Sequence, residues 1–263
     1  MSDPDTKARR EYAAPALERG FDILELLAGS GSPMTISEVA QGLGRSMSEV
    51  FRIIIVMERR GWLRRDGQTD RLSVSYRMLD IAYRATPARA LANVAAPVMQ
   101  ELAATTNQSC HLVVRAEGRG LVIQRQENAG PAGFAMRTGA IIDLVTSCSG
   151  HVLLAFAGDA SREAAIATLG PASRAAVAEL EPRLATVREQ GFEMQPSVRT
   201  AGVTDISVPV FGFDGTVAAA LTVPYLILLD DTQTIDLERS RALLIAAGAE
   251  ISGQLGARPT SGD

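Results

Sequence analysis

The sequence has only two cysteines and lacks a long apolar run. Two cysteines cannot build the disulfide framework of a small secreted domain, so we expect a protein of the reducing cytoplasm. The longest uncharged runs, residues 144–158 and 215–229, are shorter than the about 20 apolar residues that cross a bilayer. The polar first twelve residues contain no signal-peptide core. We therefore expect neither a secreted protein nor a membrane partner.

Histidine is equally scarce, and no familiar catalytic motif is present. The sequence contains two histidines, and neither a Walker loop nor a dinucleotide-binding glycine motif occurs. A Cys–His nucleophile pair would need an orienting residue and an oxyanion motif, which the sequence does not show. We expect a protein that is not an enzyme and has no cofactor. Zinc is the alternative, because Cys148 and His151 share a helix face at i, i+3 and Asp205 could join them.

What the sequence does contain is enough apolar material for a sizeable core. Hydrophobic residues make up 46% of the 263 and charged residues 21%, which indicates a folded chain of one large domain or two modest ones. Residues 1–90 hold 14 basic and 12 acidic residues, whereas residues 91–263 hold 12 and 18. Within residues 45–77 eight arginines accompany four acidic residues. Such a basic stretch favours a polyanion partner, although an ordinary solvated helix face would give the same count.

The first ninety residues predict three short helices followed by a β-hairpin. Each helix has an inward stripe of apolar residues, which in the first consists of Leu17, Phe21, Leu24 and Leu27. Capping boxes at Thr35–Glu38 and Ser46–Glu49 mark the starts of the second and third helices. The turn Asp66-Gly67 separates two short strand-like runs. This order of elements is typical of a winged helix-turn-helix.

The third predicted helix would enter the major groove of DNA with its first residues against the base edges. Val50, Ile54 and Met57 fall on its inward stripe, which leaves Phe51 and Arg52 outside. Arg52 suits a phosphate or a guanine, and Phe51 suits a thymine methyl group unless it belongs to the core. The hairpin arginines either reach the DNA backbone or belong to an ordinary exposed hairpin. The predicted DNA contacts are Arg45, Ser46, Met47, Ser48, Phe51 and Arg52 in the helix-turn-helix, and Arg64, Arg65 and Arg71 in the hairpin.

Three parts of this region, residues 16–27, 35–44 and 50–66, resemble in that order the DNA-binding domain of the IclR family of bacterial transcriptional regulators. Residues 202–211 and 214–223, with Gly191-Phe-Glu193 before them, independently resemble the effector-domain signature of that family. The resemblance implies a second domain with a GAF-like fold that binds a small molecule.

The chain departs from the family pattern at three positions. Met47 and Glu49 stand where the family usually has a basic residue and a threonine at the start of the recognition helix. Asp205 stands where the family often has a cysteine. The first departure bears on which operator sequence is read, and the second on which ligand chemistry is bound.

We therefore predict an α+β protein in which a winged helix-turn-helix is joined by a linker helix to a GAF-like α/β effector-binding domain. The predicted segments are a flexible tail at 1–12, the DNA-binding domain at 13–76, the linker helix at 77–90, the effector-binding and oligomerisation domain at 91–256, and a flexible tail at 257–263. Strands are expected at 111–114, 121–124, 134–137, 141–144, 192–195, 204–211 and 216–223, and helices at 91–105, 150–156, 161–169, 174–190 and 235–255.

An effector pocket is predicted on the inner face of the second domain. Asp205 and Ser207 lie two apart on one predicted strand and so share a face, which is either the pocket or solvent. The resemblance implies that Gly139-Ala140 touches the effector's carboxylate or carbonyl, with Arg137 as the nearest compensating donor. The full predicted set is Arg137, Gly139, Ala140, Leu144, Asp205, Ser207 and Thr222.

The function expected from these features is a ligand-responsive, DNA-binding transcriptional regulator of a catabolic operon. The alternatives are a DNA-binding protein whose second domain only oligomerises, and a metal- or redox-sensing regulator. We expect a homodimer on a pseudo-palindromic operator, paired through Trp62, Leu63 and an apolar stripe (Met78, Leu79, Ile81 and Ala82). The family resemblance implies that effector domains join dimers into a tetramer.

Overall fold

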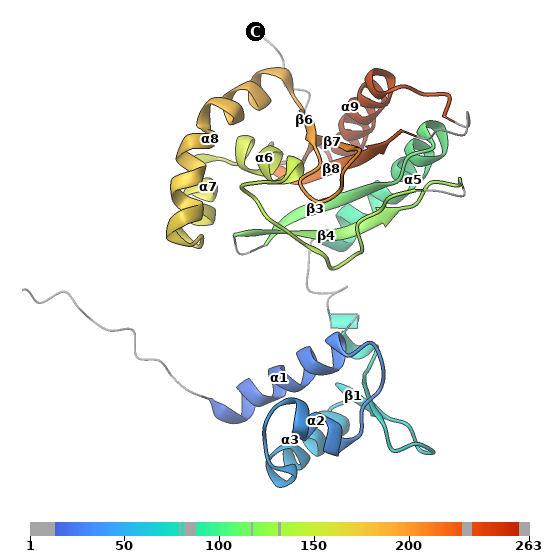
Figure 1. Ribbon diagram of the computed structural model, residues 1–263, viewed down its shortest axis with the longest axis vertical. Helices are drawn as coiled ribbons and strands as arrows, with labels where there is room; N and C mark the ends of the chain where they lie inside the picture. The colour runs from blue at the N-terminus through green and yellow to red at the C-terminus, as the bar shows by residue number, and fades with distance from the viewer. Residues whose placement is uncertain are drawn as a thin grey trace, which may run out of the picture. The chain divides into compact units, whose positions relative to one another are not determined.

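The computed structural model describes residues 14–78, 80–81, 88–116, 118–130, 133–227 and 233–257. The chain divides into two compact units, Met1–Thr86 and Pro87–Asp263, and the α+β class is as predicted (Figure 1). The division falls inside the predicted linker, of which residues 79 and 82–87 lie outside the described residues. The predicted tails lie outside them too, except for residue 257.

The first unit has the predicted three helices and hairpin. They are α1 (Pro15–Gly29), α2 (Ile36–Gly42), α3 (Met47–Arg59), β1 (Leu63–Arg65) and β2 (Leu72–Val74), with the strands antiparallel. The Glu38 carboxylate accepts from the Thr35 amide at 2.7 Å, and the Glu49 carboxylate accepts from the Ser46 amide at 3.1 Å. The two predicted helix starts are therefore confirmed.

The inward face of α1 is only partly the predicted one, because Leu24 and Leu27 pack in the core but Leu17 and Phe21 do not. Leu17 and Phe21 are 58% and 55% exposed, whereas Ile23 and Leu27 are buried in the core with Val50 and Ile54 of α3. A Cβ built on Gly20 would lie 4.0 Å from side chains of α3. Because α1 approaches α3 at this glycine, the residues three and seven positions later turn inward.

Part of the predicted pairing surface is also buried. Leu63 belongs to the core of the first unit, so it is not available to a second chain. Trp62 is half-buried, and the guanidinium of Arg77 lies over its ring at 5.6 Å. Leu79 and Ala82 of the predicted stripe lie outside the described residues.

The second unit is built on one six-stranded antiparallel sheet with the strand order β5-β4-β3-β8-β7-β6. Its strands are β3 (Cys110–Ala116), β4 (Arg119–Gln126), β5 (Ile141–Ile142), β6 (Glu193–Pro196), β7 (Val203–Phe211) and β8 (Val217–Leu226). Its helices are α5 (Ala88–Thr106), α6 (Cys148–Ala155), α7 (Asp159–Ala167), α8 (Pro171–Gln190) and α9 (Leu237–Gln254).

One predicted strand, residues 134–137, is absent and another is short. Residues 133–137 follow no regular ladder, and β5 spans two residues only. Gly139 has φ 84°, and its amide donates to the Val122 carbonyl at 2.8 Å, so the chain turns here. Phe134 and Met136 therefore leave the sheet and contribute side chains to a cavity described below.

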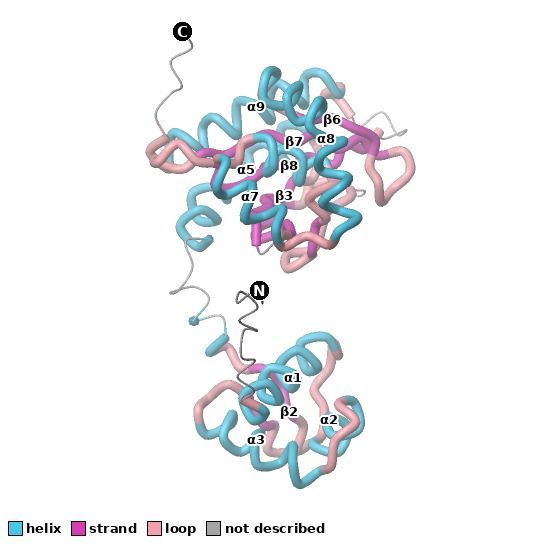
Figure 2. The backbone as a smooth tube through the Cα atoms, turned by 90° about the vertical axis from the view of Figure 1, so that its left-hand side faces the viewer, coloured by secondary structure: helices cyan, strands magenta, loops and turns pink. Residues whose placement is uncertain are grey.

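Helices cover both faces of the sheet (Figure 1 and Figure 2). α5 and α9 pack on the face that carries Leu112, Ile206 and Leu221. α6 and α8 pack on the opposite face, which carries Val113 and Ala220. All eight residues of α6 are buried, so it is the central helix of that layer. Among the described residues, no helix is both long and apolar enough to cross a membrane.

A close backbone contact seats α6. A Cβ built on Gly150 would lie 2.5 Å from the Leu144 Cα, an approach that real Cβ atoms do not make. Gly253 of α9 is also helical, yet a Cβ there meets nothing within 4 Å. The first glycine is required for packing and the second is not.

We predict that Gly150→Ala destabilises the second unit by about 2–3 kcal/mol, because the backbone of residue 144 must move. Gly253→Ala, the matched control, should stabilise it by about 0.5–1 kcal/mol through the better helix propensity of alanine. Urea unfolding of both variants measures the two effects. Equal stabilities would contradict this packing argument.

Candidate DNA interface and effector pocket

The outward face of α3 is open to solvent along the helix. Met47 and Phe51 are 53% and 47% exposed, and Ser48 and Arg52 lie beside them. The core alternative for Phe51 is therefore wrong. The Nε of Arg52 donates to the Ser48 carbonyl at 3.4 Å, which directs its side chain toward the start of the helix. In the described part of the chain no ion pair holds Arg45, Arg52 or Arg64, and all three are exposed.

Two hairpin arginines have partners within the unit. Arg65 makes two hydrogen bonds to the Glu58 carboxylate of α3, at 2.9 and 2.8 Å, and one to Asp70 at 2.9 Å. These hydrogen bonds raise the pKa of the Arg65 guanidinium. Arg71 bonds the Glu38 carboxylate at 3.0 Å and the Pro33 carbonyl at 2.8 Å. Both arginines therefore brace the hairpin against α2 and α3, and Arg64 is the hairpin arginine that projects freely.

A cavity lies on the α6 face of the sheet in the second unit. Its walls come from the sheet, the start of α6 and two loops. The lining residues are His111, Ile142, Asp205 and Thr222 from the sheet, Phe134 and Met136 from the loop before β5, Ser147, Cys148 and Ser149 at the α6 start, and Ser197, Val198 and Arg199 after β6. Apolar walls with a few polar groups are typical of a small-molecule site.

The structure brings part of the predicted effector set to this cavity. Asp205 and Thr222 line it, and Ser207 lies on the same sheet face, fully buried, with its hydroxyl 2.8 Å from that of Thr222. The solvent-facing alternative is therefore wrong for Ser207. Burial raises the pKa of the Asp205 carboxyl, and a hydrogen bond with Ser197 opposes that shift.

The other predicted effector residues lie elsewhere. Arg137, Gly139, Ala140 and Leu144 are not among the described residues that line the cavity. Leu144 is buried in the core beneath α6, and the amide of Ala140 donates to the Arg137 carbonyl at 3.0 Å within the turn. The loop that was expected to present backbone amides contributes Phe134 and Met136 side chains instead.

His111 was not among the predicted effector residues, yet it lies in the cavity wall. It pairs across the sheet with Thr222, which in turn pairs with Ser207. Burial lowers the pKa of its imidazole to about 4, so the ring is neutral near pH 7. Its Nδ1 is buried with no hydrogen-bond partner among the described residues. The sequence around His111 did not predict a place in the cavity wall. Its neighbour Cys110 points to the opposite face of the sheet.

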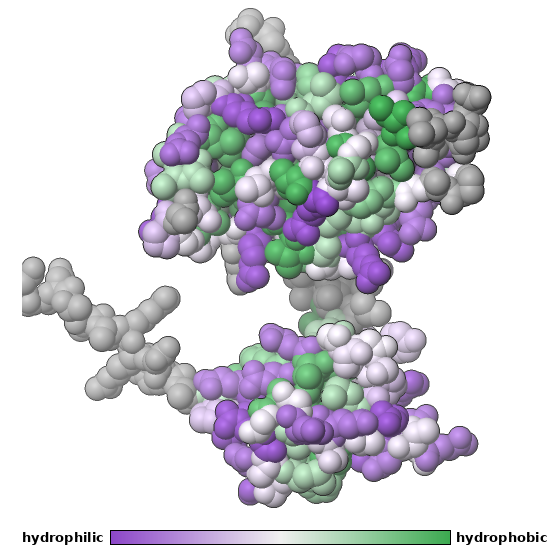
Figure 3. Space-filling model, viewed as in Figure 1, coloured by the Kyte–Doolittle hydropathy of each residue, from purple (hydrophilic) through white to green (hydrophobic). Residues whose placement is uncertain are grey.

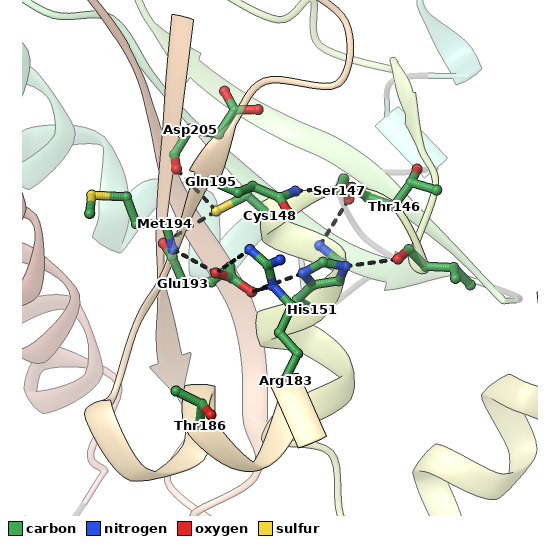
Figure 4. A network of polar contacts seen from close by, with 12 residues as sticks. Thr146, Ser147, Cys148, His151, Arg183, Thr186, Glu193, Met194, Gln195 and Asp205 are labelled. Carbon is green, nitrogen blue, oxygen red and sulfur yellow. Dashed lines mark hydrogen bonds and ion pairs between the residues drawn. The ribbon is translucent and has the colours of Figure 1, made fainter. Parts of the chain in front are cut away.

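A polar network lies next to the cavity and shares Cys148 and Asp205 with its wall (Figure 4). The Cys148 thiol donates to the carbonyls of Glu193 and Asp205, at 3.2 and 3.3 Å. His151 contacts the Glu193 carboxylate through Nδ1 at 2.9 Å and the Val145 carbonyl through Nε2 at 2.8 Å. Arg183 donates to Glu193 at 2.8 and 3.1 Å. These contacts tie α6 and α8 to the edge strand β6.

This network occupies the residues that were considered for zinc. Both ring nitrogens of His151 face protein acceptors, so the ring is not directed at Asp205. Among the described residues there is no cluster of three metal-ligating side chains. Burial raises the pKa of the Cys148 thiol well above its usual value, which disfavours the thiolate that metals and oxidants need.

Glu193 stays charged although it is buried. Burial raises the pKa of its carboxyl, but the hydrogen bonds from His151 and Arg183 outweigh that effect and bring the pKa to about 2. Glu193 is the register partner of Ser207 in the β6–β7 ladder. Glu193 therefore ends a row of cross-strand neighbours that runs through Ser207 and Thr222 to His111.

Two family models match the chain. The model described as "Bacterial transcriptional regulator IclR C-terminal" matches residues 84–252, and the "IclR helix-turn-helix domain" matches residues 16–67. The chain belongs to the IclR family. The matched segments cover both units, and the resemblance found in the sequence is confirmed.

Named relatives of this IclR-family chain are transcriptional regulators. The HTH-type transcriptional regulator XynR of Escherichia coli is 25% identical over 247 residues, which are 92% of this chain and 97% of that protein. The regulator KdgR of the same species is 27% identical over 262 residues, 97% and 98% of the two chains. A crystal structure of an IclR homologue from Microbacterium hydrocarbonoxydans, complexed with 4-hydroxybenzoate, is similar with a TM-score of 0.75 and 25% identity, over 91% of this chain and 98% of that one.

We predict that Glu193→Gln removes a pH-dependent part of the stability. A carboxyl whose folded pKa is lowered stabilises the fold above its unfolded pKa of about 4.5, and this stability is lost as the pH falls toward 2. The contribution at pH 7 is about 3 kcal/mol. Urea unfolding of wild type and variant between pH 7 and pH 3 should show the difference shrink as the pH falls.

Glu181→Gln is the matched control. The Glu181 carboxylate also pairs with two arginines, Arg162 and Arg188, but its side chain is 44% exposed, against 4% for Glu193. Its removal should therefore change stability much less. Equal losses for the two variants would contradict the structural importance of the buried cluster.

Proposed function

We propose that this protein is a ligand-responsive transcriptional regulator that binds operator DNA through its first unit and a small organic metabolite through its second. Two features of one chain together carry the proposal. One is the outer face of α3, whose exposed arginines make no ion pair within the described part of the chain. The other is a cavity with apolar walls and buried polar groups. The first suits the major groove, and the second suits a small molecule.

Operator binding rests on the start of α3. Arg45 and Arg52 offer cations to phosphates, and the first amides of the helix favour anions as well. Arg65 and Arg71 are engaged by carboxylates, so we assign them to the shape of the wing, with Arg64 as its DNA contact. The first 90 residues hold more basic than acidic residues and the rest of the chain holds more acidic than basic ones, which fits DNA binding by the first unit.

Effector binding rests on Asp205, Thr222 and His111. The Microbacterium homologue binds 4-hydroxybenzoate, and a compound of that kind, with a hydroxyl group on an apolar ring, suits this cavity. Its hydroxyl group would donate to Asp205, while its ring would lie against Phe134 and Met136. Arg199, which also lines the cavity, would pair with a carboxylate group of the ligand.

We further propose a cytoplasmic homodimer on a pseudo-palindromic operator, and a dimer of dimers through the second units. A single recognition helix covers few base pairs, so two helices related by a two-fold axis give the needed affinity. The exposed Leu17 and Phe21 of α1 extend the apolar surface available for pairing in the first unit. The effector would act by changing how the paired helices are spaced.

We predict that Arg52→Ala weakens binding to a selected operator duplex by about 1–3 kcal/mol at fixed salt. The melting temperature should barely change, because the side chain is exposed and its hydrogen bond to Ser48 is local. Fluorescence anisotropy with duplexes selected from a random pool by the full chain measures the affinity. An unchanged affinity would remove Arg52 from the interface.

We predict that Asp205→Asn leaves DNA binding intact and weakens the ligand response. 4-Hydroxybenzoate is the first probe, followed by other small hydroxylated acids, and a probe at about 100 times its Kd should stabilise the wild type by about 2.7 kcal/mol. Thermal unfolding gives the midpoint of the response. The same midpoint in the variant would place Asp205 outside the site, and no response to any probe would favour a second unit that only oligomerises.

A further inference from the structure

Helix α3 carries an exposed row of apolar side chains. Met47, Phe51 and Ile55 follow one another at i, i+4 and i+8 and are 53%, 47% and 43% exposed. The buried face of the helix, with Val50 and Ile54, is separate from this row. In Figure 3 pale green apolar atoms gather among purple polar ones at the foot of the first unit, where α3 lies. We call Met47, Phe51 and Ile55 the apolar row.

The surroundings of the apolar row indicate a polyanion as its occupant. Exposed arginines flank it, and no ion pair within the described part of the chain engages them. They are Arg45, Arg52, Arg59, Arg60 and Arg64. The acidic residue at the start of the helix, Glu49, is turned back onto Ser46 and lies 3.6 Å from Arg19. This balance of charge fits DNA better than an apolar protein surface.

The polar side chains at the helix start are already engaged. The Ser46 hydroxyl donates to the Glu49 carboxylate at 2.8 Å, and the Ser48 hydroxyl lies 3.3 Å from that of Ser46. Met47 and Phe51 carry no group that hydrogen-bonds to base edges. In the major groove the apolar feature of a base edge is the C5 methyl group of thymine.

We propose that Met47 and Phe51 read thymine methyl groups in the operator half-site, so that the apolar row sets sequence specificity by contact and not by hydrogen bonds. This inference rests on the proposed operator binding. In this proposal Arg52 contributes to affinity and orientation. Met47, which stands where the family usually has a basic residue, contributes to sequence specificity. Covering one methyl group is worth about fourfold in affinity.

The test replaces thymine by uracil, which lacks only the C5 methyl group. Duplexes are selected from a random pool by the full chain, and each thymine of the enriched half-site is then replaced singly. We expect about a fourfold loss at one or two positions and none elsewhere. At the same positions 5-methylcytosine should bind about fourfold better than cytosine, because it restores the methyl group on a different base pair.

The variants Phe51→Ser and Met47→Ser connect the methyl groups to these side chains. Each variant should abolish the uracil effect at its own position while the other position stays sensitive. Phe213→Ser is the matched control, because Phe213 is 80% exposed on the turn between β7 and β8 of the second unit. It should leave both effects unchanged.

Three results would overturn the proposal. An enriched sequence in which every uracil is tolerated would remove methyl reading and leave operator binding standing. A failure to enrich any sequence, with binding that merely weakens as salt rises, would remove the proposed function and this inference together. A change of oligomeric state in Phe51→Ser, with the uracil effect retained, would assign the apolar row to contacts between copies of the chain.

Discussion

A row of buried polar side chains across the sheet constrains the second unit. The cross-strand ladder sets Glu193 beside Ser207, Ser207 beside Thr222 and Thr222 beside His111. Buried polar groups are costly unless they are hydrogen-bonded. At one end of the row His151 and Arg183 satisfy Glu193, and in the middle the two hydroxyls bond each other. At the other end Nδ1 of His111 has no such partner among the described residues. The cavity opens beside His111, Thr222 and Asp205, so the proposed ligand would meet this end of the buried row.

The same reasoning applies to the first unit, where the unsatisfied surface is the outer face of α3. Val50, Ile54 and Leu72 are buried in its core, and three of its acidic residues, Glu38, Glu49 and Glu58, are engaged by the cap and by the wing arginines. On the outer face of α3, exposed arginines and the apolar row remain open to solvent. Phosphates attract the cations without regard to sequence, whereas the apolar row can discriminate among bases. In the proposed operator complex, affinity and specificity would therefore be carried by different residues of one helix.

Local signals in the sequence predicted what local physics decides. The capping boxes at Thr35 and Ser46, the stripe of α3 and the hairpin turn each depend on a few neighbouring residues, and each was found. The exposure of Leu17 and Phe21 on α1 was missed because it depends on the contact of Gly20 with α3. The spacing of apolar residues within α1 does not reveal that contact. His111 was missed for a related reason. The alternation of side chains along a strand predicts which face of the sheet His111 occupies. It does not predict the strand order, which brings Thr222 and Asp205 to the same part of that face. The Glu193 cluster joins β6 to the preceding helix α8 and to the more distant α6. Nothing in the sequence indicated that Arg183, among the many arginines, would pair with Glu193.

The charges of the two units limit how a ligand can control operator binding. The second unit has more acidic than basic residues, so it adds no attraction for the duplex. The cavity lies within that unit, and every residue that lines it comes from that unit. A ligand bound there therefore does not compete with DNA for the same side chains. Any effect on the operator must pass through the segment that connects the units or through contacts between chains, and it equals the difference in ligand affinity between the two arrangements. Glu193 joins α6, α8 and β6 next to the cavity, so a shift of α6 on ligand binding would have to move with these elements or break the buried contacts.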